Sequence, residues 1–150
     1  MNIHNMPVIA LAALTIFSSS ILFAQERTYI DGRSATDSNV PPFSGAVKVG
    51  DTLYLSGTIG LDDENKVPDE ASEEARLVLN SLKGTLEKAG MTMDDIVSVQ
   101  VFCSDVKHYQ EFNDVYRTFF TKEYPARAFL GAGTLLFNAR FEVQAIAIKR

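Results

Sequence analysis

The stretch from residue 69 to residue 90 constrains the fold most, because it is long and has a single apolar face. Apolar residues recur along it at helical spacing: Ala71, Ala75, Val78, Leu79, Leu82, Leu86 and Ala89. Pro68-Asp69 is typical of a helix start, and Lys88 followed by Gly90 is typical of a helix end. We interpret its acidic residues as a solvated face without a chemical role. A helix of this kind packs its apolar stripe against another layer of the protein.

The segments around this helix have the composition of β-strands. Five runs are rich in β-branched or alternating apolar residues: 43–49, 52–56, 96–102, 124–130 and 141–148. Gly50-Asp51 separates the first two runs and is a two-residue hairpin signal, and residues 27–30 form a further short extended candidate. Gly57 and Gly60 follow the second run and indicate a turn or a close backbone approach.

A second helix is predicted after Ser104-Asp105. Its inner face is an aromatic stripe that we interpret as core: Tyr109, Phe112, Val115, Tyr116, Phe119 and Phe120. The order of elements predicts an α+β domain in which both helices lie on one face of a mostly antiparallel sheet. No element is left to cover the other face, so we expect the chain to associate with copies of itself.

The two closing runs carry an acid and a base. Arg127 lies two residues beyond Pro125, and Glu142 lies in the last run. If these runs pair as a hairpin that turns near Thr134-Leu135, Arg127 falls opposite Glu142 on one face of the sheet. A guanidinium is a rigid fork that matches a carboxylate, and burying it without a partner is expensive. The pair is therefore either an internal ion pair or a binding site.

Residues 1–24 contain no Lys, Arg, Asp or Glu and are apolar over most of their length. We interpret them as a secretory signal peptide, which predicts a periplasmic or secreted protein. The alternative is an uncleaved N-terminus that tethers the protein to a membrane. Residues 25–150 then form a single domain.

The remaining composition excludes several classes of site. The net charge is −5 and no stripe of Lys or Arg is present, which argues against nucleic-acid binding. Cys103 is the one cysteine and His108 is the one histidine after the leader, so we expect no metal site and no nucleophilic triad. We interpret Cys103 as a buried small hydrophobe and place His108 in an exposed helical turn.

The chain resembles the RidA (YjgF) family of enamine/imine deaminases. The resemblance rests on residues 43–47, 49–60, 82–90, 94–97, 101–102, 112–116, 124–127 and 142–147, which occur in the family's order. It implies a homotrimer with ligand clefts at the subunit interfaces. It also implies hydrolysis of 2-aminoacrylate-type enamines and 2-iminobutanoate-type imines to 2-oxo acids and ammonia, without a metal or organic cofactor.

The resemblance also assigns roles to individual residues. Arg127 would hold the substrate carboxylate and Glu142 would position the attacking water, while Ser56 and Gly57 would line the cleft. Phe43 and Phe129 would line it too, but they stand where the family usually has Tyr and Cys, and Leu135-Leu136 replaces the usual Leu-Pro. These changes predict a more apolar pocket, so a non-catalytic binder of small carboxylates is the alternative function. Ribonuclease activity, ascribed to some relatives, is disfavoured by the negative charge.

Overall fold

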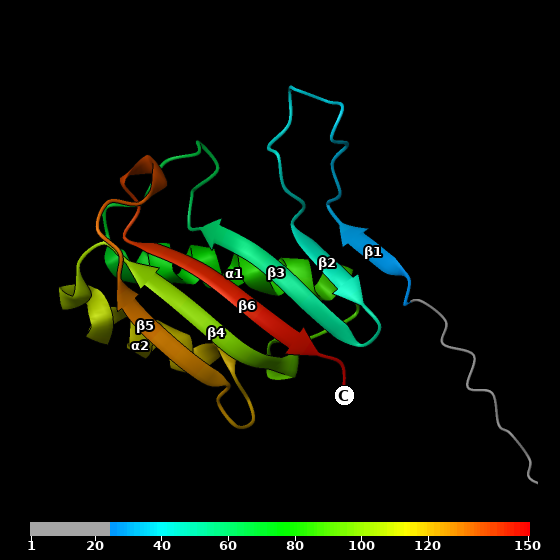
Figure 1. Cartoon of the computed structure of the whole chain (residues 1–150). Helices are drawn as coiled ribbons and strands as arrows, with labels where there is room; N and C mark the ends of the chain where they lie inside the picture. The colour runs from blue at the N-terminus through cyan, green and yellow to red at the C-terminus, as the bar shows by residue number, and fades with distance from the viewer. Residues whose placement is uncertain (1–24) are drawn as a thin grey trace, which may run out of the picture.

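The computed structural model describes residues 25–150, which form one six-stranded sheet with two helices on one face (Figure 1). The strands are β1 (Arg27–Ile30), β2 (Ala46–Val49), β3 (Thr52–Ile59), β4 (Ile96–Cys103), β5 (Ala126–Gly131) and β6 (Phe141–Ile148). The helices are α1 (Ala71–Lys88) and α2 (Tyr109–Tyr116), and short 3₁₀ turns flank α2. The predicted α+β class is confirmed. The predicted leader, residues 1–24, lies outside the described residues.

The strand order is β1-β2-β3-β6-β4-β5, and the predicted hairpin of the two closing runs is wrong. β5 pairs in parallel with β4, with Arg127 opposite Val99, and β4 pairs antiparallel with β6. The physical reason is the helix between β4 and β5, because a crossover through a helix returns the chain in the same direction. β6 then occupies the place between β3 and β4, and β5 remains at the edge of the sheet.

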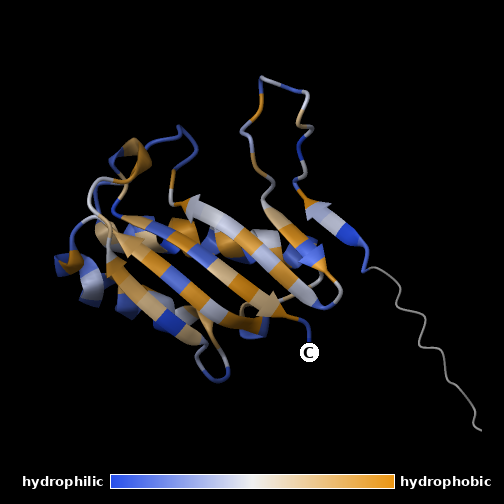
Figure 2. Ribbon diagram, in the orientation of Figure 1, coloured by the Kyte–Doolittle hydropathy of each residue, from blue (hydrophilic) through white to orange (hydrophobic). Residues whose placement is uncertain are grey.

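The core lies between the sheet and the two helices, and α1 supplies the larger share of it. The buried positions of α1 include most of the predicted stripe: Ala71, Ala75, Val78, Leu79, Leu82 and Leu86. The strands bury Leu53, Leu55, Val99, Val101, Val143 and Ala145 on the same side. Apolar and polar residues alternate along the central strands, as Figure 2 shows. Full burial of one Val or Leu side chain contributes about 1.5–3 kcal/mol, so this layer supplies most of the fold's stability.

Two predicted glycine features are confirmed. Gly50 has a φ of +58° in the two-residue loop that joins Val49 to Thr52, a conformation that glycine adopts without strain. Gly60 lies directly against the backbone carbonyl of Glu74, and a β-carbon at this position would collide with it. The end of β3 and the first turn of α1 therefore meet backbone to backbone.

The interpretation of the acidic residues of α1 as solvated is wrong for Glu74, whose residue exposure is 0%. Its Oε1 accepts hydrogen bonds from the backbone N–H groups of Arg140 (2.6 Å) and Phe141 (2.9 Å). Its Oε2 accepts a hydrogen bond from Nη1 of Arg140 at 2.8 Å. A buried carboxylate persists only when it is paired in this way. Glu74 therefore fastens the first turn of α1 to the start of β6.

The face of the sheet that points away from the helices has no cover within the described chain. The strand register places Tyr29, Val47, Tyr54 and Ile146 in one row across β1, β2, β3 and β6. Tyr54 is 50% exposed there. This apolar row is the surface for which the sequence predicts self-association. Among residues 25–150, no helix has both the length and the apolar character that a membrane span requires.

Candidate functional site

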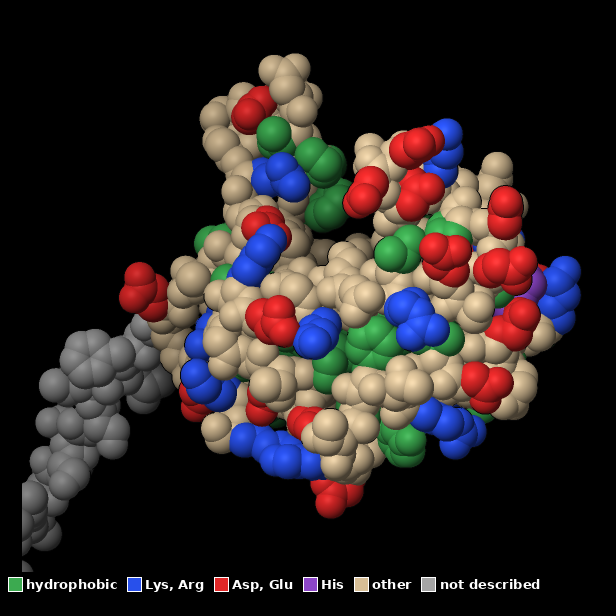
Figure 3. Space-filling model, turned by 180° about the vertical axis from the view of Figure 1, so that it is seen from behind, with side chains coloured by type: hydrophobic (Ala, Val, Ile, Leu, Met, Phe, Trp, Pro, Cys, Tyr) green, Lys and Arg blue, Asp and Glu red, His purple; other side chains and the backbone are tan. Residues whose placement is uncertain are grey.

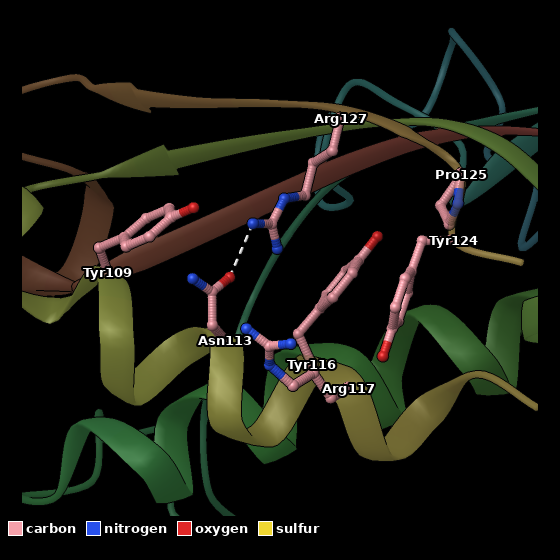
Figure 4. A pocket seen from close by; sticks show the side chains of 7 residues that line it. All are labelled: Tyr109, Asn113, Tyr116, Arg117, Tyr124, Pro125 and Arg127. Carbon is pink, nitrogen blue, oxygen red and sulfur yellow. Dashed lines mark hydrogen bonds between the residues drawn. The ribbon is translucent and has the colours of Figure 1, made fainter.

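Arg127 lies on β5 and points toward α2 (Figure 4). Its Nη2 donates a hydrogen bond to Oδ1 of Asn113 at 2.7 Å, and its guanidinium carbon lies 4.5 Å from the ring centroid of Tyr116. Nη1 of Arg127 and the hydroxyl of Tyr116 are both buried, and neither has a hydrogen-bond partner among the described residues. No described carboxylate lies within salt-bridge distance of Arg127. The guanidinium is held in place by an amide and a ring, which leaves its charge uncompensated.

The helical spacing of α2 explains this arrangement. Tyr109, Asn113 and Tyr116 are separated by four and three residues, so they share the face of α2 that meets β5. The interpretation of this stripe as core is only partly correct. Phe112, Val115 and Tyr116 are buried, but Tyr109 is 47% exposed. The stripe thus contributes to the core at its centre and to a surface cavity at one side.

The cavity beside Arg127 has a volume of about 210 Å³. Seven residues line it: Tyr109, Asn113, Tyr116, Arg117, Tyr124, Pro125 and Arg127. None of these seven is an acid, although the protein as a whole carries a net charge of −5. The lining is therefore a local concentration of positive charge and hydrogen-bond donors between aromatic rings, which is suited to a small organic anion.

The pKa values of two tyrosines beside Arg127, Tyr109 and Tyr116, are shifted in opposite directions. Contact with the Asn113 side chain, followed by the charge of Arg127, lowers the pKa of Tyr109. Burial raises the pKa of Tyr116 to about 12, although the charge of Arg127 acts against this shift. Tyr116 therefore remains protonated at neutral pH, and its hydroxyl is available as a donor or an acceptor.

The other predicted site residues lie elsewhere in the chain. Glu142 pairs in register with Ile59 and Phe102, and its neighbours in β6, Phe141 and Val143, point into the core. Because successive side chains of a strand alternate, Glu142 lies on the open face of the sheet and Arg127 on the helix face. The expectation that they share a face is wrong, and they form no internal ion pair.

Gly57 and Ser56 lie close to Glu142 rather than to Arg127. A β-carbon on Gly57 would collide with Oε1 of Glu142, so the predicted close approach is real. The hydroxyl of Ser56 donates a hydrogen bond to the carbonyl of Ser44 at 2.7 Å. Ser56, Gly57 and Phe43 line a second cavity of about 160 Å³ where β3 extends beyond β2. Glu142 touches Gly57 but does not itself line this cavity. The predicted site residues thus lie in two separate places within one chain, which we call the Arg127 half and the Gly57–Glu142 half.

Comparisons with known proteins show the family to which the chain belongs. A family model described as Endoribonuclease L-PSP matches residues 32–149. The 2-iminobutanoate/2-iminopropanoate deaminase of Dermatophagoides farinae is 35% identical over 111 residues, covering 73% of this chain and 87% of that protein. The protein of the same name from Mus musculus is 35% identical over 112 residues, covering 73% and 83%. The chain belongs to the YjgF/RidA family.

Solved structures share the fold. The YjgF gene product of E. coli is 30% identical with a TM-score of 0.70, and E. coli TdcF with bound serine is 28% identical with a TM-score of 0.71. Each match covers 74% of this chain and 91% of the solved chain. The resemblance of the sequence to the YjgF/RidA family is therefore confirmed.

Phe43 and Phe129, two of the departures expected from the family resemblance, have different surroundings. Phe129 lies on the same side of β5 as Arg127, with its ring edge-on to Tyr109 at 5.0 Å and to Phe112 at 5.6 Å between centroids. Phe43 is 56% exposed beside the second cavity. Phe129 thus makes the Arg127 half more apolar, and the ring of Phe43 is exposed at the edge of the second cavity.

Cys103 and His108 do not belong to either half. Cys103 is buried as predicted, and burial raises the pKa of its thiol, which opposes any role as a nucleophile. His108 is less exposed than predicted, because its ring packs against Phe141 and its Nδ1 lies 2.9 Å from Oε2 of Glu111. The part of the chain that the structure describes contains no group of three or more His, Cys, Asp and Glu side chains arranged to hold a metal.

The sequence prediction missed six of the seven residues of the Arg127 cavity: Tyr109, Asn113, Tyr116, Arg117, Tyr124 and Pro125. Asn113 was the available signal, because it interrupts an otherwise apolar helix face and is nearly fully buried. A buried amide needs a hydrogen-bonding partner, and the nearest strand supplies Arg127. Arg117 gave no such signal, since an exposed arginine at a helix end is common.

Proposed function

We propose that the protein hydrolyses small 2-imino acids, and the 2-enamine acids in equilibrium with them, to 2-oxo acids and ammonia. The observation that carries the proposal is Arg127, a half-buried guanidinium with an unpaired Nη1 beside a cavity that has no acidic lining. Relatives named 2-iminobutanoate/2-iminopropanoate deaminase, about 35% identical, support the chemistry. The serine bound to E. coli TdcF supports a site for small amino-acid-like molecules in this fold.

The residues divide the work of imine hydrolysis. Arg127 binds the substrate carboxylate, and Asn113 and the Tyr116 ring fix the guanidinium so that little rotational freedom is lost on binding. A water oxygen attacks the imine carbon while Glu142 accepts a proton from that water and passes it to the imine nitrogen, which gives the carbinolamine. Glu142 then accepts the hydroxyl proton of the carbinolamine and passes it to the nitrogen, so the carbon–nitrogen bond breaks and ammonia leaves. The hydroxyl oxygen remains as the carbonyl of the 2-oxo acid.

This division requires a second copy of the chain, because Arg127 and Glu142 lie on opposite faces of one sheet. We propose a homotrimer in which the Arg127 half of one copy meets the Gly57–Glu142 half of the next. The uncovered apolar row that includes Tyr54 and Ile146 supports such an assembly. Light scattering of the purified protein should give three times the monomer mass.

Mixing two impaired variants tests the shared site directly. Arg127→Gln and Glu142→Gln each disable one half, so each alone should be at least about tenfold slower than the wild type. Unfolded and refolded together in equal amounts, they form mixed oligomers in which about a quarter of the interfaces have both native halves. Recovery of about a quarter of the wild-type rate is expected. No recovery, with mixed oligomers shown to form, contradicts a site shared between copies.

The activity itself is measured on 2-iminobutanoate or 2-aminoacrylate released by an amino-acid oxidase or dehydratase, with semicarbazide trapping the remaining imine. The wild-type protein should lower the yield of the semicarbazide adduct. Arg127→Gln should reduce kcat/KM by about 10- to 100-fold, the usual effect of losing a charge-assisted hydrogen bond. Arg76→Gln makes the same charge change away from both halves and serves as the control. Imine loss no faster than in buffer rejects the deaminase.

A non-catalytic binder of small carboxylates is the second candidate. It is favoured by Phe43 and Phe129, which place rings without hydrogen-bonding groups in the two halves of the site. Binding of 2-oxobutanoate that depends on Arg127, without any acceleration of imine loss, would select this function. Ribonuclease activity is disfavoured, because charges of both signs are interspersed on the helix-side surface and the net charge is −5 (Figure 3).

Export of the protein is a further part of the proposal and rests on the apolar, uncharged residues 1–24. Fractionation of cells that express the full-length chain with a C-terminal tag tests it. A shortened protein in the exported fraction supports cleavage. A full-length protein in the membrane fraction supports a tether, and a full-length protein in the cytosol rejects both.

A further inference from the structure

A second guanidinium lines the cavity beside Arg127. Arg117 follows the last residue of α2 and stands on the same helix side as Asn113 and Tyr116 (Figure 4). It forms no salt bridge with any described carboxylate. Nothing within the described chain thus neutralises either charge of this cavity.

The hydrogen-bonding groups of the cavity are poorly matched to a ligand with one carboxylate. The Oδ1 acceptor of Asn113 is already used by Arg127, while Nη1 of Arg127 and the hydroxyl of Tyr116 have no partner. One carboxylate on Arg127 would leave Arg117 facing the rest of the ligand. Arg117 is exposed, so an apolar tail there would gain no electrostatic attraction from its charge. A second carboxylate provides acceptors instead.

The cavity has room for a small organic acid. Its volume of about 210 Å³ far exceeds the ~10–15 Å³ that one water needs. The rings of Tyr109 and Tyr124 form part of its wall and can contact the carbon chain between two charged ends. The cavity thus combines two cationic positions with an apolar wall.

We propose that the preferred ligands are 2-imino dicarboxylic acids, with the carboxylate next to the imine on Arg127 and the distal carboxylate on Arg117. The reaction of these ligands rests on the deaminase proposed above, whereas the binding preference does not. Arg117 is then the residue that determines specificity for a second negative charge. An enzyme that oxidises a dicarboxylic amino acid would supply such an imine.

The test compares two stable product-like probes of equal chain length, 2-oxoglutarate and 2-oxopentanoate, by titration calorimetry of the full-length protein. They differ in one terminal group, a carboxylate against a methyl. We expect 2-oxoglutarate to bind about fivefold more tightly at low salt, and the preference to shrink as salt is added. Equal affinities for the two probes would overturn the proposal.

Three variants locate the preference. Arg117→Gln should bring the ratio of the two affinities close to one, whereas Arg76→Gln, which changes the net charge equally outside this cavity, should leave the ratio unchanged. Arg127→Gln should weaken both probes. A preference that survives Arg117→Gln, or that disappears in Arg76→Gln, assigns it to something other than Arg117. Because only binding is measured, a protein that prefers 2-oxoglutarate but hydrolyses no imine would reject the deaminase and retain this inference.

Discussion

Replacing Glu74 by Ala should destabilise the fold more than any other single charged-to-alanine change in α1. The substitution leaves two backbone N–H groups, those of Arg140 and Phe141, without the acceptor they have at 2.6 and 2.9 Å. An unpaired buried donor costs about 1–3 kcal/mol, and breaking a buried ion pair costs about 3–5 kcal/mol. The Arg140 side chain is 25% exposed and keeps the carbonyls of Pro68 and Asp69 as acceptors. We therefore expect a loss near the lower limit, about 3 kcal/mol in the free energy of unfolding.

The assay is urea unfolding followed by far-ultraviolet circular dichroism, because the chain has no Trp. All proteins are compared at one concentration, since self-association would add to the apparent stability. Glu73→Ala is the matched control, because Glu73 lies in the same first turn but is exposed, and it should change stability by at most about 0.5 kcal/mol. If the two variants lose free energy of unfolding to within about 1 kcal/mol of each other, Glu74 does not stabilise the attachment of α1 to β6 as inferred above.

Four further predictions concern single residues. Gly57→Ala should displace Glu142 and lower the rate of imine hydrolysis at least about tenfold, as measured in the imine assay. Gly84 lies in open space within α1, so Gly84→Ala should stabilise the fold by about 0.5–1 kcal/mol, as measured by urea unfolding. In an ultraviolet pH titration, the last tyrosine to ionise should be Tyr116, and Tyr116→Phe should remove that step. The pKa of Tyr116 is about 12 in the folded state and about 10 in the unfolded state. Its contribution to stability is therefore complete below pH 10 and is lost as the pH rises through 12. Cys103 should react with iodoacetamide far more slowly in the native protein than in urea, and equal rates would contradict its burial.

Local pattern predicted most of the elements, because helices and strands with one buried face leave a periodic signal. The apolar stripe of α1 and the hairpin at Gly50 both follow from neighbouring residues, and both are confirmed. The partner of β5 did not follow, because adjacent strands in the sequence were assumed to be adjacent in the sheet. That choice depends on how α2 packs between β4 and β5, which is decided by contacts far apart in the chain.

The sequence predicts several residues that lie beside cavities, but it does not predict how they are placed relative to one another. Arg127, Ser56 and Gly57 all lie beside cavities, but no local pattern separates them into two places in the fold. The error in strand pairing had a direct consequence for chemistry, since a shift by an odd number of residues moves a side chain to the other face of a sheet. Asn113 is not predicted for a related reason. Its side chain accepts a hydrogen bond from Arg127, which lies on a different element of the fold.

The position of Glu142 follows from the register of the central strands, and it decides what kind of site this fold supports. Arg127 is opposite Val99, and Val99 is opposite Ala145, so these three residues form one row on the helix face. Glu142 is three residues from Ala145, an odd offset, and therefore points to the open face. Within one chain, the groups that would bind a carboxylate and activate water are separated by the sheet itself. The open face is also where the apolar row lies, so the same surface that favours association presents Glu142 to a neighbouring copy. Self-association and catalysis are thus expected to depend on each other, and a monomeric variant should lose hydrolysis while each chain retains its own Arg127 cavity.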